Sequence, residues 1–160
     1  MTMMIPEHSG PGNSVMVVVA HPDDAEFMCS GTVAKWTKAG KDITYVLATS
    51  GDKGSPDPSI PPQDLALIRE AEQRQVCQLL GVNNVEFLRY PDGTLQNNLE
   101  LRKSIVRLIR KYKPAAVITE NPTARWVGNY VNHPDHRAIG DATMDAVFPS
   151  ARDIHMFPEL

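Results

Sequence analysis

Two short stretches of the sequence place histidine and aspartate side chains in a pattern that suits metal-dependent chemistry. The first stretch is His21-Pro22-Asp23-Asp24, and the second is His133-Pro134-Asp135-His136. Three of the five histidines fall in these two stretches. Imidazole nitrogens and carboxylate oxygens form a mixed ligand set that suits catalytic zinc, which keeps one coordination position open for water. The sequence therefore favours a metal site to which both stretches contribute.

The plainer explanation for each stretch is helix capping. Asp23 or Asp24 could cap the helix expected after them, because a carboxylate accepts hydrogen bonds from the free N–H groups of a first helical turn. Capping alone does not account for the repeated His-Pro-Asp triplet. The ligand candidates are His21, Asp24, His133 and His136, of which three would bind the metal. The spacing does not decide between His133 and His136.

We expect each of the two stretches to lie after a strand of a parallel sheet. Residues 15–20 form a continuous apolar, mostly β-branched run, which is typical of a strand buried on both faces. The other expected strands are 43–48, 85–88 and 115–119. The apolar spacing predicts helices over about 25–39, 63–80, 99–113 and 134–147.

The alternation of strands and helices predicts the fold class α/β: a Rossmann-like three-layer α/β/α architecture with a mainly parallel sheet. Ligands of such sheets bind beside the carboxyl ends of the strands. The segments that follow the strands are 21–24, 49–55, 89–93 and 119–136, and we expect them to meet at one rim. Residues 1–14 are expected to be a flexible N-terminal arm, and residues 15–160 a single domain.

The composition excludes several classes of protein. The chain has 160 residues, 42% hydrophobic and 22% charged, which suits one globular domain and not a disordered chain. A net charge of -3 argues against a nucleic-acid binder with a basic surface. We expect no membrane span and no secretory signal. The two cysteines exclude a disulfide framework and favour a cytoplasmic location.

The chain resembles the LmbE/PIG-L family in six motifs that occur in the order found in that family: AHPDD (20–24), TSGDKG (49–54), IREAE (68–72), LLGV (79–82), YPDG (90–93) and HPDH (133–136). The resemblance runs from about Val15 to Val147, and the pair of AHPDD and HPDH is its most specific part. Members of the family are zinc-dependent de-N-acetylases of N-acetylglucosamine-type substrates. The resemblance implies a hydrolase that releases acetate from a small N-acetylated amino-sugar substrate and leaves a free amine.

The resemblance also implies roles for the two His-Asp stretches. His21, Asp24 and His136 would hold Zn²⁺. Asp23 would be the general base that takes a proton from water. His133 would polarise the carbonyl or act as the partner acid.

Three further roles follow from the resemblance. Asp135 would orient His133, as a carboxylate behind a functional histidine usually does. Arg69 would approach the sugar, and the alternative is an ordinary helical ion pair with Glu72. Asp92 would contact a sugar hydroxyl, and the alternative is a plain Pro-Asp-Gly turn.

Other features leave alternatives open. Family members usually continue beyond the point where this chain ends, so we expect the chain to lack the family's C-terminal segment, and a homo-oligomer is allowed. The competing functions are a zinc amidase on another small amide, a non-catalytic metal- or sugar-binding relative, and a nucleotide-binding domain, which no glycine-rich phosphate motif supports. Trp126 and Tyr130 precede HPDH, where an aromatic side chain either stacks on a sugar or packs within its loop.

Overall fold

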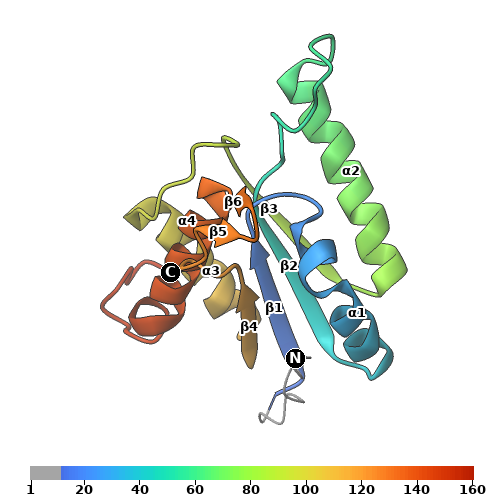
Figure 1. The fold of residues 1–160 in the computed structure, drawn as a ribbon. Coiled ribbons are helices and arrows are strands. Elements are labelled where there is room, and N and C mark those ends of the chain that lie inside the picture. Colours follow the sequence, from blue (N-terminus) through green and yellow to red (C-terminus); the bar gives the residue numbers. More distant parts are fainter. Residues whose placement is uncertain (1–11) are drawn as a thin grey trace.

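The computed structural model describes residues 12–160, and a four-stranded parallel sheet forms its centre (Figure 1). The strands lie in the order β3-β2-β1-β4, with these bounds: β1 Ser14–Val19, β2 Asp42–Thr49, β3 Asn84–Tyr90 and β4 Ala116–Thr119. Residues 1–11 of the expected N-terminal arm lie outside the described residues. Ser14, which the sequence analysis placed in the arm, belongs to β1 and pairs with Asp42.

Helices cover both faces of the sheet (Figure 1). On one face lie α1 (Asp24–Lys38) and α2 (Pro62–Leu80), and on the other lie α3 (Leu99–Tyr112), α4 (Pro134–Asp145) and a short helical segment, Ala146–Ser150. The prediction of a three-layer α/β/α fold with a mainly parallel sheet is confirmed. Within residues 12–160, no helix has the length and apolar character that crossing a membrane requires.

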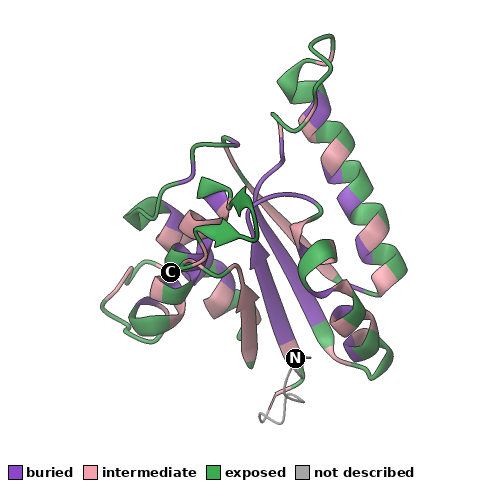
Figure 2. Ribbon diagram, viewed as in Figure 1, coloured by how far each residue is buried: buried purple, intermediate pink, exposed green. Residues whose placement is uncertain are grey.

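β1 is buried on both faces, as its apolar run predicted (Figure 2). Val15, Val17 and Val19 pack with α1 on one face, while Met16 and Val18 pack with α3 and α4 on the other. Each of these side chains is at most 1% exposed. Full burial of such a side chain contributes about 1.5–3 kcal/mol. The strand is therefore held from both sides, which fixes the position of the residues that follow it.

One element was not expected from the sequence. Residues 126–131 form an antiparallel hairpin of two short strands, β5 (Trp126–Val127) and β6 (Tyr130–Val131). Gly128 has φ +60°, the left-handed conformation that tight hairpin turns need and that glycine takes without strain. Strands of two residues are too short to show an alternating pattern, so the sequence analysis left this segment in a loop.

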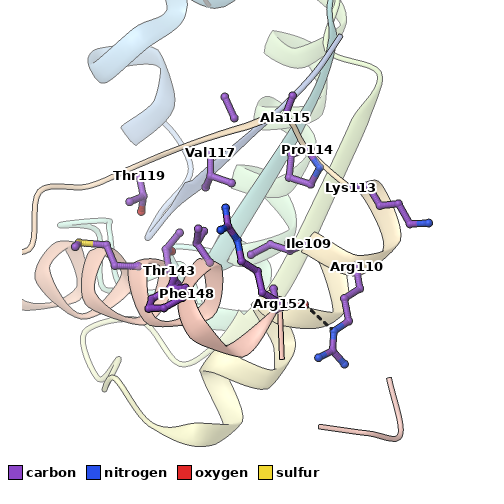
Figure 3. Close-up of a pocket in the computed structure, with 14 residues that line it drawn as sticks. Ile109, Arg110, Lys113, Pro114, Ala115, Val117, Thr119, Thr143, Phe148 and Arg152 are labelled. Carbon is purple, nitrogen blue, oxygen red and sulfur yellow. Dashed lines mark hydrogen bonds between the residues drawn. The ribbon is translucent and has the colours of Figure 1, made fainter. Parts of the chain in front are cut away.

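The outer edge of β4 opens on a cavity of about 730 Å³ (Figure 3). Its lining comes from α3, β4, the link between them, the end of α4 and the segment after α4, with Ile109, Val117 and Phe148 among the apolar side chains. A large pocket is the usual place for a binding site. Among the described residues that line it, however, there is no carboxylate, imidazole or thiol. The groups that could carry out a reaction lie at another edge of the sheet.

Candidate metal centre and active site

The polar segments that follow the strands meet at the carboxyl end of the sheet, as predicted. They surround a cavity of about 500 Å³, whose lining residues are His21, Asp23, Lys53, Gly54, Arg69, Asp92, Gly93, His133 and His136. All of these residues except Arg69 come from the four segments named in the sequence analysis, and Arg69 reaches the cavity from α2.

His21 follows β1, and its two ring nitrogens have different neighbours. Nδ1 lies 3.3 Å from Oδ2 of Asp24. Nε2 lies 3.1 Å from Oδ1 of Asp92 and 3.3 Å from Oδ2 of Asp135. A carboxylate that accepts the proton of one ring nitrogen fixes the tautomer and leaves the other nitrogen free to bind a metal. Both nitrogens of His21 thus face carboxylates, and in the tautomer that carries its proton on Nε2, Nδ1 is the nitrogen available to a metal beside Asp24.

His136 lies in the first turn of α4 and is arranged in the same way. Its Nε2 lies 3.1 Å from Oδ1 of Asp24, and its Nδ1 lies 3.0 Å from the side-chain oxygen of Asn132. The ring centroids of His21 and His136 are 5.3 Å apart. The carboxylate of Asp24 therefore lies between two imidazoles whose outward nitrogens are already bonded.

The charges of this cluster reinforce one another. Burial would raise the pKa of Asp24, but hydrogen bonds from His136 and His21 and their positive charges hold it well below its usual range. The hydrogen bond to Asp24 raises the pKa of His136. Burial lowers the pKa of His21, but the neighbouring carboxylates outweigh this effect and raise it. Asp24 is thus ionised, which is the form that binds a metal.

The donor set of this cluster fits a divalent metal ion. His21, Asp24 and His136 together offer two imidazole nitrogens and a carboxylate, as in catalytic zinc sites. The sets of described residues whose ligand atoms all lie within 4.8 Å of one another are different ones: His21, His133 and His136; His21, Asp92 and Asp135; Asp24, Glu120 and His136. The outward bonds from Asp92, Asp135 and Asn132 nevertheless favour the set of His21, Asp24 and His136, because they leave one nitrogen of His21 and one of His136 turned toward Asp24.

His133 is placed differently from His136. It lies directly before α4, where its Nδ1 accepts a hydrogen bond of 3.2 Å from the backbone N–H of Asp135. Burial, followed by the positive charge of His21, lowers the pKa of His133. The ring is therefore neutral more readily than an ordinary histidine. Since Nδ1 accepts a hydrogen bond, the proton of the neutral ring is on Nε2.

Asp23 has an unusual backbone conformation, with φ +83° and ψ -23°. Residues other than glycine rarely adopt this left-handed region, and holding one there costs about 1–3 kcal/mol. Gln73 accepts the backbone N–H of Asp23 at 3.0 Å and holds it there. The side chain of Asp23 is 58% exposed, whereas that of Asp24 is 12% exposed. The turn thus separates the two carboxylates, one facing the cluster and one facing the open cavity.

Arg69 ties the loop after β1 to the loop after β2. Its Nη2 donates to the backbone oxygen of Pro22 at 2.7 Å and to Oδ2 of Asp23 at 3.1 Å, and its Nη1 donates to the backbone oxygen of Gly51 at 3.2 Å. A Cβ on Gly51 or Gly54 would lie 2.1 or 2.4 Å from Nη1, so only glycine leaves room for the guanidinium. The sequence analysis gave an ion pair with Glu72 as the alternative for Arg69. In the structure its guanidinium bonds to the two loops instead.

The sequence analysis expected the carboxylate of Asp135 to orient His133. In the structure this carboxylate contacts other groups. The Asp135 side chain is fully buried, and it accepts the backbone N–H groups of Gly93 at 2.7 Å and Leu95 at 3.1 Å. The remaining contact is with His21. As the second residue of α4, Asp135 has its side chain turned inward, away from the imidazole that caps the helix.

Asp92 was expected at a sugar hydroxyl. The structure places its carboxylate, which is largely buried, between His21 and the backbone N–H of Lys53, which donates to Oδ2 at 3.1 Å. Three site residues were missed by the sequence analysis: Gln73, Glu120 and Asn132. Only Glu120 had a usable signal, because it directly follows β4 at the carboxyl end of the sheet.

Comparison with known proteins decides the family. The family profile described as GlcNAc-PI de-N-acetylase (PIG-L) matches residues 16–147. The chain belongs to the PIG-L family. The stretch matched by the PIG-L profile contains every candidate site residue named above, from His21 to His136.

Individual relatives within the PIG-L family are deacetylases by name. The chain is 37% identical to a diacetylchitobiose deacetylase of Thermococcus kodakarensis over 83% of its length and 48% of that protein. It is 32% identical to a probable N-acetyl-alpha-D-glucosaminyl L-malate deacetylase 2 of Bacillus anthracis, over 83% of this chain and 58% of that one.

A solved PIG-L-type structure confirms the fold. The N,N'-diacetylchitobiose deacetylase of Pyrococcus horikoshii superposes with a TM-score of 0.81 at 33% identity, over 88% of this chain and 51% of that one. The chain thus spans about half the length of these relatives.

Proposed function

We propose that this chain carries the active site of a zinc-dependent hydrolase that removes the N-acetyl group from an N-acetylglucosamine-type substrate. The products would be acetate and a free amino sugar. The observation that carries the proposal is the pair of adjacent carboxylates after β1. Asp24 lies between His21 and His136, while Asp23 faces the cavity. The names of the relatives support the reaction and the substrate class.

The metal would be held by His21, Asp24 and His136. When bound, zinc polarises an amide carbonyl and makes a water molecule easier to ionise. Zinc itself is part of the proposal, because Fe²⁺ or Mn²⁺ suits the same nitrogen and oxygen donors. A teicoplanin deacetylase that shares the fold at 19% identity has been crystallised in a zinc-inhibited form.

Asp23 is proposed to accept the proton of the attacking water. Burial raises the pKa of its carboxyl group, against the lowering effect of Arg69. A carboxylate with a raised pKa is a stronger base, and its catalytic contribution is larger for that reason. Arg69 fixes one carboxylate oxygen through a bond of 3.1 Å, which leaves the other oxygen for the water.

His133 is proposed to stabilise the oxyanion that forms when the carbonyl is attacked. Its Nε2–H is the donor, because Nδ1 is occupied by the backbone N–H of Asp135. The proton that Asp23 takes from the water then passes to the leaving nitrogen, so that the amine departs in its neutral form and Asp23 returns to its carboxylate form. In this scheme Asp135 supports His21 by its carboxylate and His133 by its backbone.

Substrate binding is assigned to Arg69 and Asp92, with Lys53 beside them in the cavity lining. The three hydrogen bonds of Arg69 leave the flat face of its guanidinium group available to a substrate. Asp92 contributes mainly through His21, because its carboxylate is already in contact with that ring and with the backbone of Lys53. A small N-acetylated amino sugar is the proposed partner, and the cytoplasmic location and self-association stay predictions.

A second candidate is an amidase for another small amide. The chain is 29% identical to a mycothiol S-conjugate amidase of Streptomyces coelicolor over 91% of its length and 55% of that protein. The same base and metal ligands would serve both reactions. A panel of N-acetylated sugars and thiol-conjugate amides separates the two by which amide releases a free amine.

The test of the proposed function begins with metal content. We expect near-stoichiometric zinc in the purified protein by elemental mass spectrometry and little in His136→Ala. Acetate release from N-acetylglucosamine compounds is then measured with the zinc-loaded protein. A protein that binds zinc but releases no acetate from any member of the panel would be a non-catalytic relative, and the proposal would fall.

A further inference from the structure

The hairpin of β5 and β6 is coloured as exposed in Figure 2, and it carries four apolar residues that take no part in the hydrophobic core. Trp126 is 69% exposed, Val127 58%, Tyr130 79% and Val131 67%. An isolated two-stranded hairpin is marginally stable at best, and these side chains add nothing to the core. A cluster of exposed apolar residues of this kind marks a surface that meets a ligand or a partner.

The pairing of the hairpin gives it two similar faces. Trp126 lies opposite Val131, and Val127 lies opposite Tyr130. Residues directly opposite each other share a face of the ribbon, whereas neighbours along a strand point to opposite faces. Each face therefore carries one aromatic and one β-branched side chain.

The base of the hairpin is bonded to the candidate metal centre. Asn132 donates its backbone N–H to the oxygen of Arg125 at 2.9 Å and its side-chain N–H to the oxygen of Ala124 at 2.8 Å. Its side-chain oxygen lies 3.0 Å from Nδ1 of His136. Val131 is two residues from His133, a span of about 7 Å at most. The hairpin thus begins at the edge of the candidate active site.

The cavity itself supplies no apolar surface of this kind. Its lining residues are polar or glycine, and none of those described is aliphatic, Trp, Tyr or Phe. A cavity of about 500 Å³ with that lining suits one polar acetamido sugar. A sugar ring also has a C–H face, and Trp and Tyr combine an apolar ring with a polar edge that can meet such a ligand.

We propose that the β5–β6 hairpin binds the part of the substrate attached to the N-acetylated sugar, such as a second sugar ring, through Trp126, which shares a face of the ribbon with Val131, two residues before His133. This inference rests on the proposed function, because it places the reacting acetamide in the neighbouring cavity. It makes the hairpin a determinant of substrate choice, outside the groups that carry out the reaction. The competing occupant is a second copy of this chain.

The kinetic test compares one ring with two. Amine release is measured for N-acetylglucosamine and for N,N'-diacetylchitobiose in the wild type, Trp126→Ala and Tyr130→Ala. We expect the KM for the disaccharide to rise about five- to tenfold in Trp126→Ala, as the loss of an aromatic contact predicts, and to change less than about twofold in Tyr130→Ala, whose ring is on the opposite face. The kcat and the KM for the single sugar should change less than about twofold. Equal changes for both substrates, or none, would overturn the proposal.

The matched control is Leu79→Ala in the last turn of α2, a side chain that is 86% exposed. It removes an exposed apolar group of similar kind from another element, and we expect no change for either substrate. Trp126→Phe keeps an aromatic ring and should restore most of the disaccharide affinity.

Binding is also measured without catalysis, through tryptophan fluorescence. The chain has two tryptophans, and Trp36 is 9% exposed, so Trp126 is the one that a ligand can reach. Titration with N,N'-diacetylchitobiose should shift the emission of the wild type to shorter wavelength but leave that of Trp126→Phe unchanged. A shift without hydrolysis would remove the proposed function and keep the binding surface. Hydrolysis without a shift would support the proposed function and reject the hairpin as the binding surface.

Light scattering tests the competing occupant. We expect Trp126→Ala to leave the molar mass of the protein unchanged. A lower molar mass in this variant, together with equal losses for both substrates, would mean that a second copy of the chain covers the hairpin, and the substrate proposal would be rejected.

Discussion

Asp135 Oδ2 lies 3.3 Å from Nε2 of His21, although 114 residues separate the two in the sequence. This contact joins the start of α4 to the end of β1. The same carboxylate accepts the backbone N–H groups of Gly93 and Leu95, so one buried side chain connects three of the loops that form the site.

Replacing Asp135 should therefore weaken metal binding without removing a ligand. In Asp135→Asn we expect the affinity for zinc to fall about 10- to 100-fold, the usual effect of losing a carboxylate behind a metal-bound histidine. Competition with a chelator measures the affinity. Asp141→Asn, an exposed residue of α4, is the control. An unchanged affinity in Asp135→Asn would show that the contact with His21 does not act on the metal.

Asp23→Asn should retain both the fold and the metal. Asparagine tolerates the left-handed conformation of this position, and Asp23 is not in the proposed ligand set. We expect kcat to fall about 10²–10⁴-fold, the range for losing a general base. Steady-state kinetics and metal analysis of the same preparation check both statements. Activity close to wild type would exclude Asp23 as the base.

The two histidines of HPDH should respond in opposite ways. His136→Ala should lose the metal, because its Nε2 faces Asp24. His133→Ala should keep the metal and lose activity, since its Nδ1 is used by the backbone of Asp135. Zinc content after extensive dialysis distinguishes them. The reverse pattern would mean that His133 is the ligand.

Arg69 is predicted to act on Asp23 and not on the metal. Arg69→Ala should lower kcat by about ten- to a hundredfold, because misplacing a catalytic group by 1 Å costs about that much. Zinc content should stay at the wild-type value. Arg74→Ala, on the same helix but half exposed, is the control. Loss of zinc in Arg69→Ala would place Arg69 among the supports of the metal centre.

Two helical glycines should differ in sign when replaced by alanine. A Cβ on Gly140 would lie 2.5 Å from the backbone oxygen of Glu120, so Gly140→Ala should destabilise the protein by about 1–3 kcal/mol. A Cβ on Gly31 would meet nothing within 4 Å, so Gly31→Ala in α1 should stabilise it by about 0.5–1 kcal/mol. Thermal or urea unfolding measures both. Equal effects would show that α4 can shift away from Glu120.

The order and position of the strands and helices were predictable, because they depend on patterns of apolar and polar residues that are local in the sequence. The apolar run of β1 predicted a strand buried on both faces, and the polar residues after the strands predicted where the loops meet. Gly81, with φ +74° after α2, ended that helix as expected. The hairpin was missed because each of its strands has only two residues.

The supporting contacts of the site could not be predicted from the sequence, because they join distant parts of the chain. Gln73 holds the backbone of Asp23 across 50 residues. Asn132 is close to His136 in sequence, but its role depends on which ring nitrogen faces Asp24. Sequence spacing indicates which residues can share a site, whereas the partner of each nitrogen depends on packing.

The hydrogen bonds described above that join the hairpin to the candidate metal centre all involve Asn132. Its backbone and side chain bond to the base of the hairpin, and its side-chain oxygen contacts His136. The side chains of Trp126 and Tyr130 take no part in those bonds. We therefore expect substitutions at the tip of the hairpin to leave the arrangement of His21, Asp24 and His136 intact. A hairpin attached in this way allows its exposed residues to change while the cluster of His21, Asp24 and His136 keeps its arrangement.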